Sequence, residues 1–483
     1  MAALSLSAAA WGSEPFRAGP LYDEFQLTLS PGQRVEAAGP FFYEEEKEAE
    51  RTWAIPPLLS YARNPDLEME EFDFVYPILT YDRYGDQYRW QLFQLLSFAG
   101  GPTQTETNRN RFTLYPLFFS QRSSDTNENY TAYGPFYGHL KHRLMRDEIF
   151  YVMFPFYSQT RKKDVVTRNY VYPFFHLRHG DGLEGWQVWP LTGHEQKTVT
   201  TRTNMFGDLE MVPGHEKRFV LWPIYFNQTT GIGTTNEAKE QAVIPAYSLL
   251  RSPARDSTTV LWPFFSRIDD REKGYLEWDA PWPLIVFARG PGKYTSRVFP
   301  FYSHAYNTNL QSDFFLWPVY KYNRLQSGAL DRRRTRICFF LYSDVTEKNT
   351  ETSAYRRRTE MWPFFTRKRD LNGNTRLQVL ALLEPLVPGT HKIDRDYSPL
   401  WSLWRDERNV QTGAASQSLL WNLYRRDVRP DSKKISLFFG LYQSRQDAEG
   451  KMRKLFFIPI SRSTQSETGA GDIPADETSD LSK

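Results

Sequence analysis

Residues 258–266 read Thr-Thr-Val-Leu-Trp-Pro-Phe-Phe-Ser, and similar segments recur along the whole chain. Aligned on the motif proline, or on the residue in its place, 22 copies follow one another from Pro40 to Pro459. Successive copies are roughly 20 residues apart, a spacing typical of tandem repeats. The step from Pro190 to Pro223 is clearly longer than the others. A pattern of this length indicates a single repeat array, which overrides the roughly two to four domains that the chain length would otherwise suggest.

The clearest copies pair a tryptophan with the proline. This repeat signature comprises Trp189, Pro190, Trp222, Pro223, Trp262, Pro263, Trp282, Pro283, Trp317, Pro318, Trp362 and Pro363. The flanking residues are β-branched or aromatic and favour strands, so we expect one strand centred on each motif, about 22 in all. About ten polar residues join successive copies, too few for the crossover helix between parallel neighbours. The sequence therefore predicts an all-β, antiparallel up-and-down meander.

Two architectures would protect such a meander. Counted outward from the proline, side chains on both faces of each strand are apolar at the centre, so contact from both sides is expected. Closure as an outer-membrane-type β-barrel would remove the exposed edges. The alternative is a soluble propeller-like or stacked-sheet array, in which the aromatic belt is core. Neither explains the proline, which cannot donate to a strand ladder and belongs at edges or bulges.

Three regions of the chain are distinguished by composition. Residues 1–20 are expected to be either a truncated signal or a flexible terminus, because they are apolar and small but lack a positively charged start. Residues 21–462 form the array, with a long insert at 195–217 that accounts for the long step after Pro190. Residues 463–483 are expected to be a disordered polar tail.

Charge and apolar patterning exclude some classes of protein. No apolar run approaches the roughly 18 residues of a membrane helix. Net charge is +3 overall, but residues 1–80 hold fourteen acidic and five basic side chains, a net of −9, which leaves +12 for the remainder. The basic clusters lie at polar strand flanks, where solvated charge is the usual state, so no nucleic-acid partner is expected. The single cysteine, Cys338, is interpreted as a buried thiol.

The search for catalytic chemistry finds none of the common motifs, so no catalytic, cofactor or metal residues are assigned. Exposed tryptophans at strand ends, Trp186, Trp278 and Trp404, could stack on sugars. We expect a non-enzymatic cell-envelope protein, in the form of an outer-membrane barrel in contact with the lipid bilayer, with a structural or transport role. The alternative is a soluble periplasmic or secreted protein that binds polysaccharide or a protein partner. A hydrolase with its site in an inter-strand loop is a third hypothesis.

The array resembles a group of uncharacterised bacterial proteins with tandem Trp-Pro-aromatic single-strand repeats. The resemblance spans roughly Gly39 to Pro459 and rests on the signature residues quoted above. It implies a bacterial origin and no particular activity.

Overall fold

The computed structural model describes residues 21–464, apart from 104–105, 205 and 449. The expected signal or flexible segment at 1–20 lies outside the described residues, as does nearly all of the expected C-terminal tail. Within this range the chain forms 45 strands and two short α-helices. Forty-three of the strands belong to one antiparallel sheet, and β20 and β21 pair only with each other.

The first part of the sheet runs through β19. Its strands are β1 (Asp23–Gln26), β2 (Gly32–Ala37), β3 (Phe42–Lys47), β4 (Glu50–Ile55), β5 (Leu59–Asn64), β6 (Met69–Phe74), β7 (Leu79–Tyr84), β8 (Gln87–Leu92), β9 (Leu96–Gly100), β10 (Arg109–Leu114), β11 (Phe118–Ser123), β12 (Tyr130–Tyr133), β13 (Tyr137–Arg143), β14 (Arg146–Val152), β15 (Tyr157–Lys162), β16 (Val165–Tyr170), β17 (Phe175–Gly180), β18 (Leu183–Val188) and β19 (Thr192–Lys197). Two 3-10 turns, η2 (Gly39–Phe41) and η3 (Thr126–Glu128), lie among them.

The separate hairpin β20 (Thr200–Thr203) and β21 (Leu209–Val212) follows within the long step between Pro190 and Pro223. The sheet then continues with β22 (Gly214–Val220), β23 (Tyr225–Ile232), β24 (Ala238–Val243), β25 (Tyr247–Arg251), β26 (Arg255–Val260), β27 (Phe265–Asp270), β28 (Tyr275–Asp279), β29 (Ile285–Arg289), β30 (Tyr294–Val298), β31 (Tyr302–Tyr306), β32 (Leu310–Phe315), β33 (Tyr320–Ser327), β34 (Leu330–Ile337), β35 (Tyr342–Asn349), β36 (Tyr355–Met361), β37 (Phe365–Arg369) and β38 (Thr375–Val379).

Both helices occupy the connection to the last strands. They are α1 (His391–Asp396) and α2 (Ser398–Trp401). The remaining strands are β39 (Trp404–Arg408), β40 (Ala415–Leu419), β41 (Tyr424–Val428), β42 (Ser432–Leu437), β43 (Tyr442–Asp447), β44 (Gly450–Leu455) and β45 (Ile458–Thr464).

The expected count of about 22 strands is wrong, because each repeat contributes two strands rather than one. The motif does not lie at a strand centre: β26 ends at Val260 and β27 begins at Phe265, so Leu261 to Phe264 form the turn between them. Proline cannot donate to a strand ladder, but it is well suited to a turn. The placement of proline in a turn therefore explains why it recurs in the motif, which a proline at the centre of each strand could not explain.

Three motif positions depart from this pattern. Pro385 and Ser402 fall within the single long connection between β38 and β39, which carries both helices. Pro459 lies inside β45, where the ladder with β44 shifts its register between Arg453 and Lys454.

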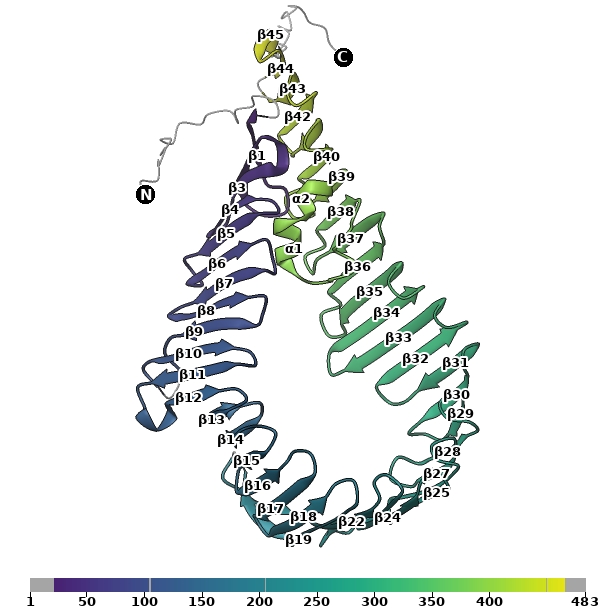
Figure 1. Ribbon diagram of the computed structural model, residues 1–483. Helices are drawn as coiled ribbons and strands as arrows, with labels where there is room; N and C mark the ends of the chain where they lie inside the picture. Colours follow the sequence, from purple (N-terminus) through teal and green to yellow (C-terminus); the bar gives the residue numbers. More distant parts are fainter. Residues whose placement is uncertain (1–20, 104–105, 205, 449, 465–483) are drawn as a thin grey trace, which may run out of the picture.

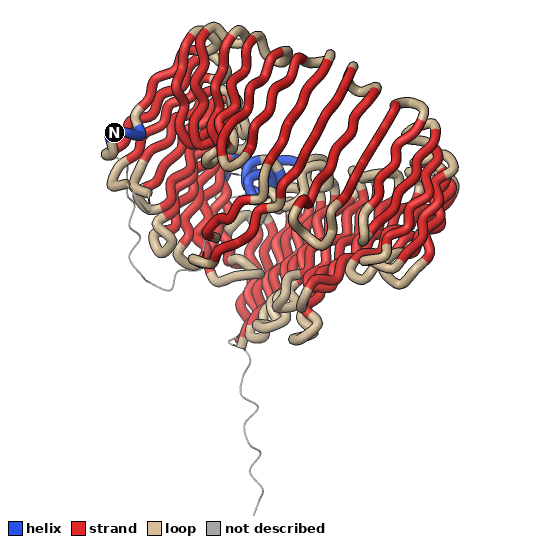
Figure 2. Tube along the Cα trace, turned by 90° about the horizontal axis from the view of Figure 1, so that it is seen from below, coloured by secondary structure: helices blue, strands red, loops and turns tan. Residues whose placement is uncertain are grey.

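The sheet is a long, narrow ribbon whose ends come back together. In Figure 1 it curves into a teardrop-shaped loop, with β1–β5 beside β38–β42 at the narrow end and α1 and α2 between them. Seen from below, its strands run between two rows of turns, one along each edge (Figure 2). In the described residues β1 pairs only with β2, and β45 only with β44, so the expected closure into a barrel by strand pairing is not found.

Side chains, rather than a backbone ladder, join the two ends. The guanidinium of Arg425 in β41 stacks on the ring of Phe25 in β1, 3.5 Å from its centroid. Asn422 donates a hydrogen bond to the carboxylate of Glu36 in β2 at 2.9 Å. These contacts join side chains on the same face of the first and the last strands. The two ends of the ribbon therefore pack against each other through this face.

The inner face is the one that meets α1, and the outer face is its opposite. On β4–β6 the inner face carries Ala54, Ser60 and Asp73, which are all buried, while the outer face carries aromatic side chains. The expectation that both faces are apolar is therefore wrong. It was counted from the proline across a turn, where strand alternation does not continue.

Candidate functional site

Several motif turns share one backbone geometry. In the turn of residues 261–264, Phe264 N–H donates to the Leu261 carbonyl at 2.9 Å, with Pro263 in the third position and its peptide bond cis. The turns at 221–224 and 316–319 close in the same way, at 2.6 and 2.7 Å. Proline at this position of a four-residue turn matches the known turn type with a cis-proline.

Neighbouring turns are tied to one another as well. Leu261 N–H donates to the carbonyl of Ala246 in the preceding motif turn at 2.8 Å, and Leu316 N–H donates to Phe301 at 2.6 Å. In a meander, every second turn lies at the same edge, so the motif turns form one continuous, hydrogen-bonded row. We call this row the aromatic rim.

The aromatic rim exposes its apolar side chains. Trp262 is 43% exposed and Phe264 is 49% exposed, and the flanking strand residues Val260 and Phe265 are also exposed. The same holds around the sheet, where the exposed turn residues include Phe93, Leu117, Phe136, Phe156, Phe174, Leu191, Trp222, Ile224, Leu284, Phe301, Trp317, Phe339, Phe364, Trp421, Phe438 and Phe456. Soluble monomers rarely expose an apolar patch above a few hundred Å², and such a patch indicates a binding surface.

All members of the predicted repeat signature belong to the aromatic rim. Trp189, Pro190, Trp222, Pro223, Trp262, Pro263, Trp282, Pro283, Trp317, Pro318, Trp362 and Pro363 lie in turns at this edge, where the six tryptophans are exposed or half-buried. Cys338 begins one of these turns and is half-buried, so its interpretation as a buried core thiol is wrong. Trp186 and Trp278, by contrast, lie on the outer face within β18 and β28, and both are exposed.

A second cluster of charged side chains lies inside the narrow end of the loop. Helix α1 presents Lys392 and Arg395 to the acidic inner face of β6 and β7. Lys392 Nζ lies 3.1 Å from Asp73 and 2.7 Å from Asp82, while Arg395 donates to Glu71 at 2.8 Å and also to Asp73. We call the contacts of α1 with these strands, together with its contacts with β37 to β39 on the opposite side, the ionic clamp.

The opposite wall completes the ionic clamp. Asp394 of α1 pairs with Lys368 of β37, and Arg376 and Arg405 add to the positive charge around this carboxylate. Behind the helix, buried Glu384 accepts hydrogen bonds from Gln378 at 2.7 Å and from Ser398. The helix thus carries cations toward the acidic wall and an anion toward the basic wall. Its contacts hold together parts of the sheet that are far apart in sequence.

The pKa values of the ionic clamp reflect these contacts. Burial opposes ionisation of Glu71, but the hydrogen bond with His391 and the charges of Arg395 and Lys392 outweigh it and lower the pKa of Glu71 to about 2. The same hydrogen bond raises the pKa of His391 above its ordinary 6.5. Sequence reasoning missed this cluster, since its members are spread from β6 to α1 and no local pattern joins them.

We expect the ionic clamp to be most stable between about pH 4.5 and 6.5. Glu71 contributes stability above its ordinary pKa of 4.5, which is lost as the pH falls from there toward 2. His391 contributes stability below 6.5, which is lost as the pH rises through its raised folded-state pKa. Thermal unfolding followed on both sides of this window checks the expectation. His391→Gln should abolish the loss at higher pH and also reduce the loss at lower pH, because the His391 hydrogen bond contributes to the lowered pKa of Glu71. An unchanged alkaline limb would contradict the assignment.

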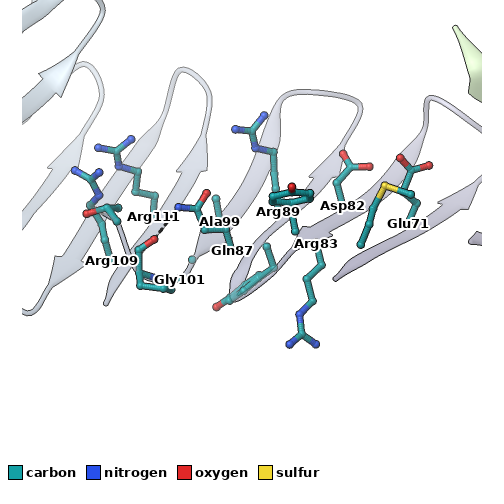
Figure 3. Close-up of a pocket in the computed structure, with 15 residues that line it drawn as sticks. Glu71, Asp82, Arg83, Gln87, Arg89, Ala99, Gly101, Arg109 and Arg111 are labelled. Carbon is teal, nitrogen blue, oxygen red and sulfur yellow. Dashed lines mark hydrogen bonds between the residues drawn. The ribbon is translucent and has the colours of Figure 1, made fainter. Parts of the chain in front are cut away.

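A hollow of about 460 Å³ lies next to the ionic clamp, over the inner face of β6–β10. In Figure 3, Glu71, Asp82, Arg89 and Arg111 point to the same side of the sheet, while Arg83 points to the other. Arg111 donates to Gln121 at 2.6 Å, and Asp82 is paired with Lys392. Arg111 is therefore held by a neighbour in the sheet, whereas Asp82 and Glu71 are held by side chains of α1.

The described residues contain no group of three or more histidine, cysteine or acidic side chains placed to hold a metal ion. No helix among them is both long and apolar enough to cross a membrane. Neither the models of known protein families nor the curated proteins include one that matches this chain.

Proposed function

We propose that this protein is a non-enzymatic protein of the bacterial cell envelope that rests on a membrane, with its aromatic rim in the lipid. The observation that carries the proposal is the continuous row of exposed tryptophan, phenylalanine and leucine side chains along one edge of the sheet, the aromatic rim. Tryptophan and tyrosine are typical of membrane interfaces, where one end of the ring is apolar and the other is wet. The outer membrane is the membrane that we favour.

The length of the strands argues for a rim that enters one leaflet. A spanning barrel strand needs about 9–11 residues and an apolar band roughly 25 Å tall. Most strands here have five or six residues, and the longest in the sheet have eight. On the outer face of β26 and β27, the apolar residues Val260 and Phe265 at the turn give way to Thr258 and Arg267 two positions away. An apolar height of roughly 10 Å fits the boundary between headgroups and acyl chains.

The opposite edge is suited to water. Its turns are largely polar, as in residues 271–274 between β27 and β28, where Lys273 N–H donates to the Asp270 carboxylate at 2.9 Å. Exposed apolar residues such as Leu144 and Met145 occur in single turns there and do not form a continuous row. A ribbon with one apolar edge and one polar edge has a defined orientation at an interface. A structural role at the membrane, or the movement of a substrate across the loop, would use this orientation.

A glycan-binding role is supported less well. The outer-face tryptophans Trp186 and Trp278 are exposed, as a sugar platform requires. However, the guanidinium of Arg267 already covers the Trp278 ring at 4.9 Å from its centroid. Only the aromatic rim repeats around the whole sheet.

Sedimentation with vesicles tests the proposal. The full-length protein, purified in mild detergent and diluted below its micellar concentration, should co-sediment with vesicles of phosphatidylcholine alone, because burial of the aromatic rim needs no lipid charge. Light scattering on the detergent-free protein should show aggregation through the rim. A monodisperse monomer that does not bind these vesicles would overturn the proposal. A discrete dimer would also overturn it, since the aromatic rim would then be covered by a second copy.

A further inference from the structure

Six basic side chains gather on the inner face of β33 to β36, all of them on three of these four neighbouring strands. They are Lys321 of β33, Arg332, Arg334 and Arg336 of β34, and Arg356 and Arg358 of β36. The same face of these strands holds two carboxylates, Glu347 and Glu360, which leaves a net charge of +4 (six minus two). We call these six cations the basic patch.

The carboxylates of this face are engaged at its margins. Glu347 pairs with Arg332 at 3.2 Å and with Arg356, and Glu360 lies 3.2 Å from Arg358. Within the described residues, Lys321, Arg334 and Arg336 have no acidic side chain within 4.0 Å. These three cations form the centre of the basic patch.

The arrangement of the central cations is unfavourable without a counter-ion. Lys321 stands directly opposite Arg336 across the β33–β34 ladder, and Arg334 follows two residues away on the same face. Like charges directly opposite each other destabilise a sheet. Burial and the charges of Arg336, Arg297 and Arg334 lower the pKa of Lys321, and burial and the neighbouring arginines lower that of Arg334. A sequence that keeps such a conflict usually does so at a functional site.

The basic patch also lies at a defined distance from the aromatic rim. Arg336 and Lys321 are each the second strand residue from a motif turn, next to Ile337 and Tyr320 respectively. At about 3.3 Å per residue they sit roughly 7 Å above the turns. A rim buried about 5–10 Å deep at the headgroup boundary would therefore place these cations at about the level of lipid phosphates.

The loop is wide enough for lipid headgroups to reach its inner face. Between β8 and β35 the sheet has 26 strands, that is 28 labels minus β20 and β21. At about 4.8 Å per strand their contour is roughly 125 Å, which corresponds to a circle about 40 Å across. Sheet walls that touch through their side chains lie only about 10 Å apart. These strands form the wide end of the teardrop in Figure 1.

We propose that the basic patch binds the phosphate groups of anionic lipids enclosed by the loop, with Lys321, Arg334 and Arg336 as the central ligands. This inference rests on the proposed function, since the aromatic rim brings the patch to headgroup depth. Arginine and lysine are the side chains that bind phosphate through charge-assisted hydrogen bonds.

The test compares vesicles of phosphatidylcholine with vesicles that also contain phosphatidylglycerol, in phosphate-free buffer. Wild-type protein should prefer the anionic vesicles, and Lys321→Gln with Arg336→Gln should lower that preference about 30-fold, at roughly fivefold per cation. Binding of this variant to phosphatidylcholine should not change. The control is Arg333→Gln with Arg357→Gln, which removes the same charge from the outer face of β34 and β36.

The outcomes separate this inference from the proposed function. If the wild type does not bind phosphatidylcholine vesicles, the proposed function of the aromatic rim is wrong. If the Lys321→Gln, Arg336→Gln variant keeps its preference for anionic vesicles, only the proposed role of the basic patch is wrong. An equal loss in the outer-face control would overturn it too, because bulk charge would explain the preference. So would abolition of the preference by a small excess of inorganic phosphate, which would make free phosphate the ligand. The thermal midpoint of the inner-face variant should be unchanged or raised, since a like-charge contact is removed. Arg334→Gln alone serves if that variant does not fold.

Discussion

Replacing Trp262 and Trp317 by serine should lower partitioning into phosphatidylcholine vesicles by between about 30-fold and 1,000-fold. The two rings are 43% and 38% exposed at the aromatic rim. Each would bury on the order of 50 to 80 Å² of apolar surface in lipid, worth about 1 to 2 kcal/mol. The two losses together amount to about 2 to 4 kcal/mol, and each 1.4 kcal/mol is a factor of ten.

The matched control replaces Trp186 and Trp278 by serine. These rings are 46% and 53% exposed, slightly more than the rim pair, but they lie on the outer face within their strands. Vesicle binding of this variant should equal that of the wild type. If both double variants lose binding to the same extent, general apolar adsorption rather than the rim is responsible. If only the control variant is affected, the proposed orientation is wrong.

Arg395→Met should destabilise the ionic clamp by about 3 to 5 kcal/mol, the usual effect of removing one partner from a buried ion pair. Its side chain is 8% exposed, and its guanidinium contacts Glu71, Asp73 and Asp396. Methionine retains most of the aliphatic packing but leaves these carboxylates without their main counter-ion. The expected results are an earlier unfolding transition in denaturant and separation of the two ends of the sheet.

Spin labels at Glu48 and Thr412, in a Cys338→Ser background, report on the ends directly. Both positions are exposed. Glu48 lies between β3 and β4 and Thr412 between β39 and β40, and Figure 1 shows these two pairs of strands on opposite sides of the junction. The wild type should give one short distance, and Arg395→Met a longer and broader distribution. Arg271→Met is the control, because its pair with Asp256 is exposed at the surface and should not affect either measurement. An unchanged distance distribution in Arg395→Met would show that the ends are held by other contacts.

Local sequence determined the class of the fold and the location of the candidate lipid-binding surface. The repeat period and the short polar connections were sufficient for an antiparallel meander, since both follow from chain geometry between neighbouring residues. The signature from Trp189 to Pro363 does mark one edge of the sheet. The motif was nevertheless predicted at strand centres, whereas it lies in turns. β-branched and aromatic neighbours such as Val260 and Phe265 indicate a strand equally well whether they flank a turn or a strand centre. The absent N–H of proline was the signal that would have distinguished the two.

Only the tertiary structure decided how the two ends of the ribbon meet. Whether the first strands meet the last strands through a ladder or through side chains depends on curvature summed over 43 strands, and no local pattern encodes that sum. The ionic clamp and the basic patch have the same origin. Lys392 of α1 meets Asp73 of the distant strand β6, and Lys321 faces Arg336 only because register and alternation place both on the inner face. Sequence alone determined the repeat and its chemistry, because these are set within a single repeat; the tertiary structure determined which charges face one another, because that depends on where a curved sheet brings distant strands.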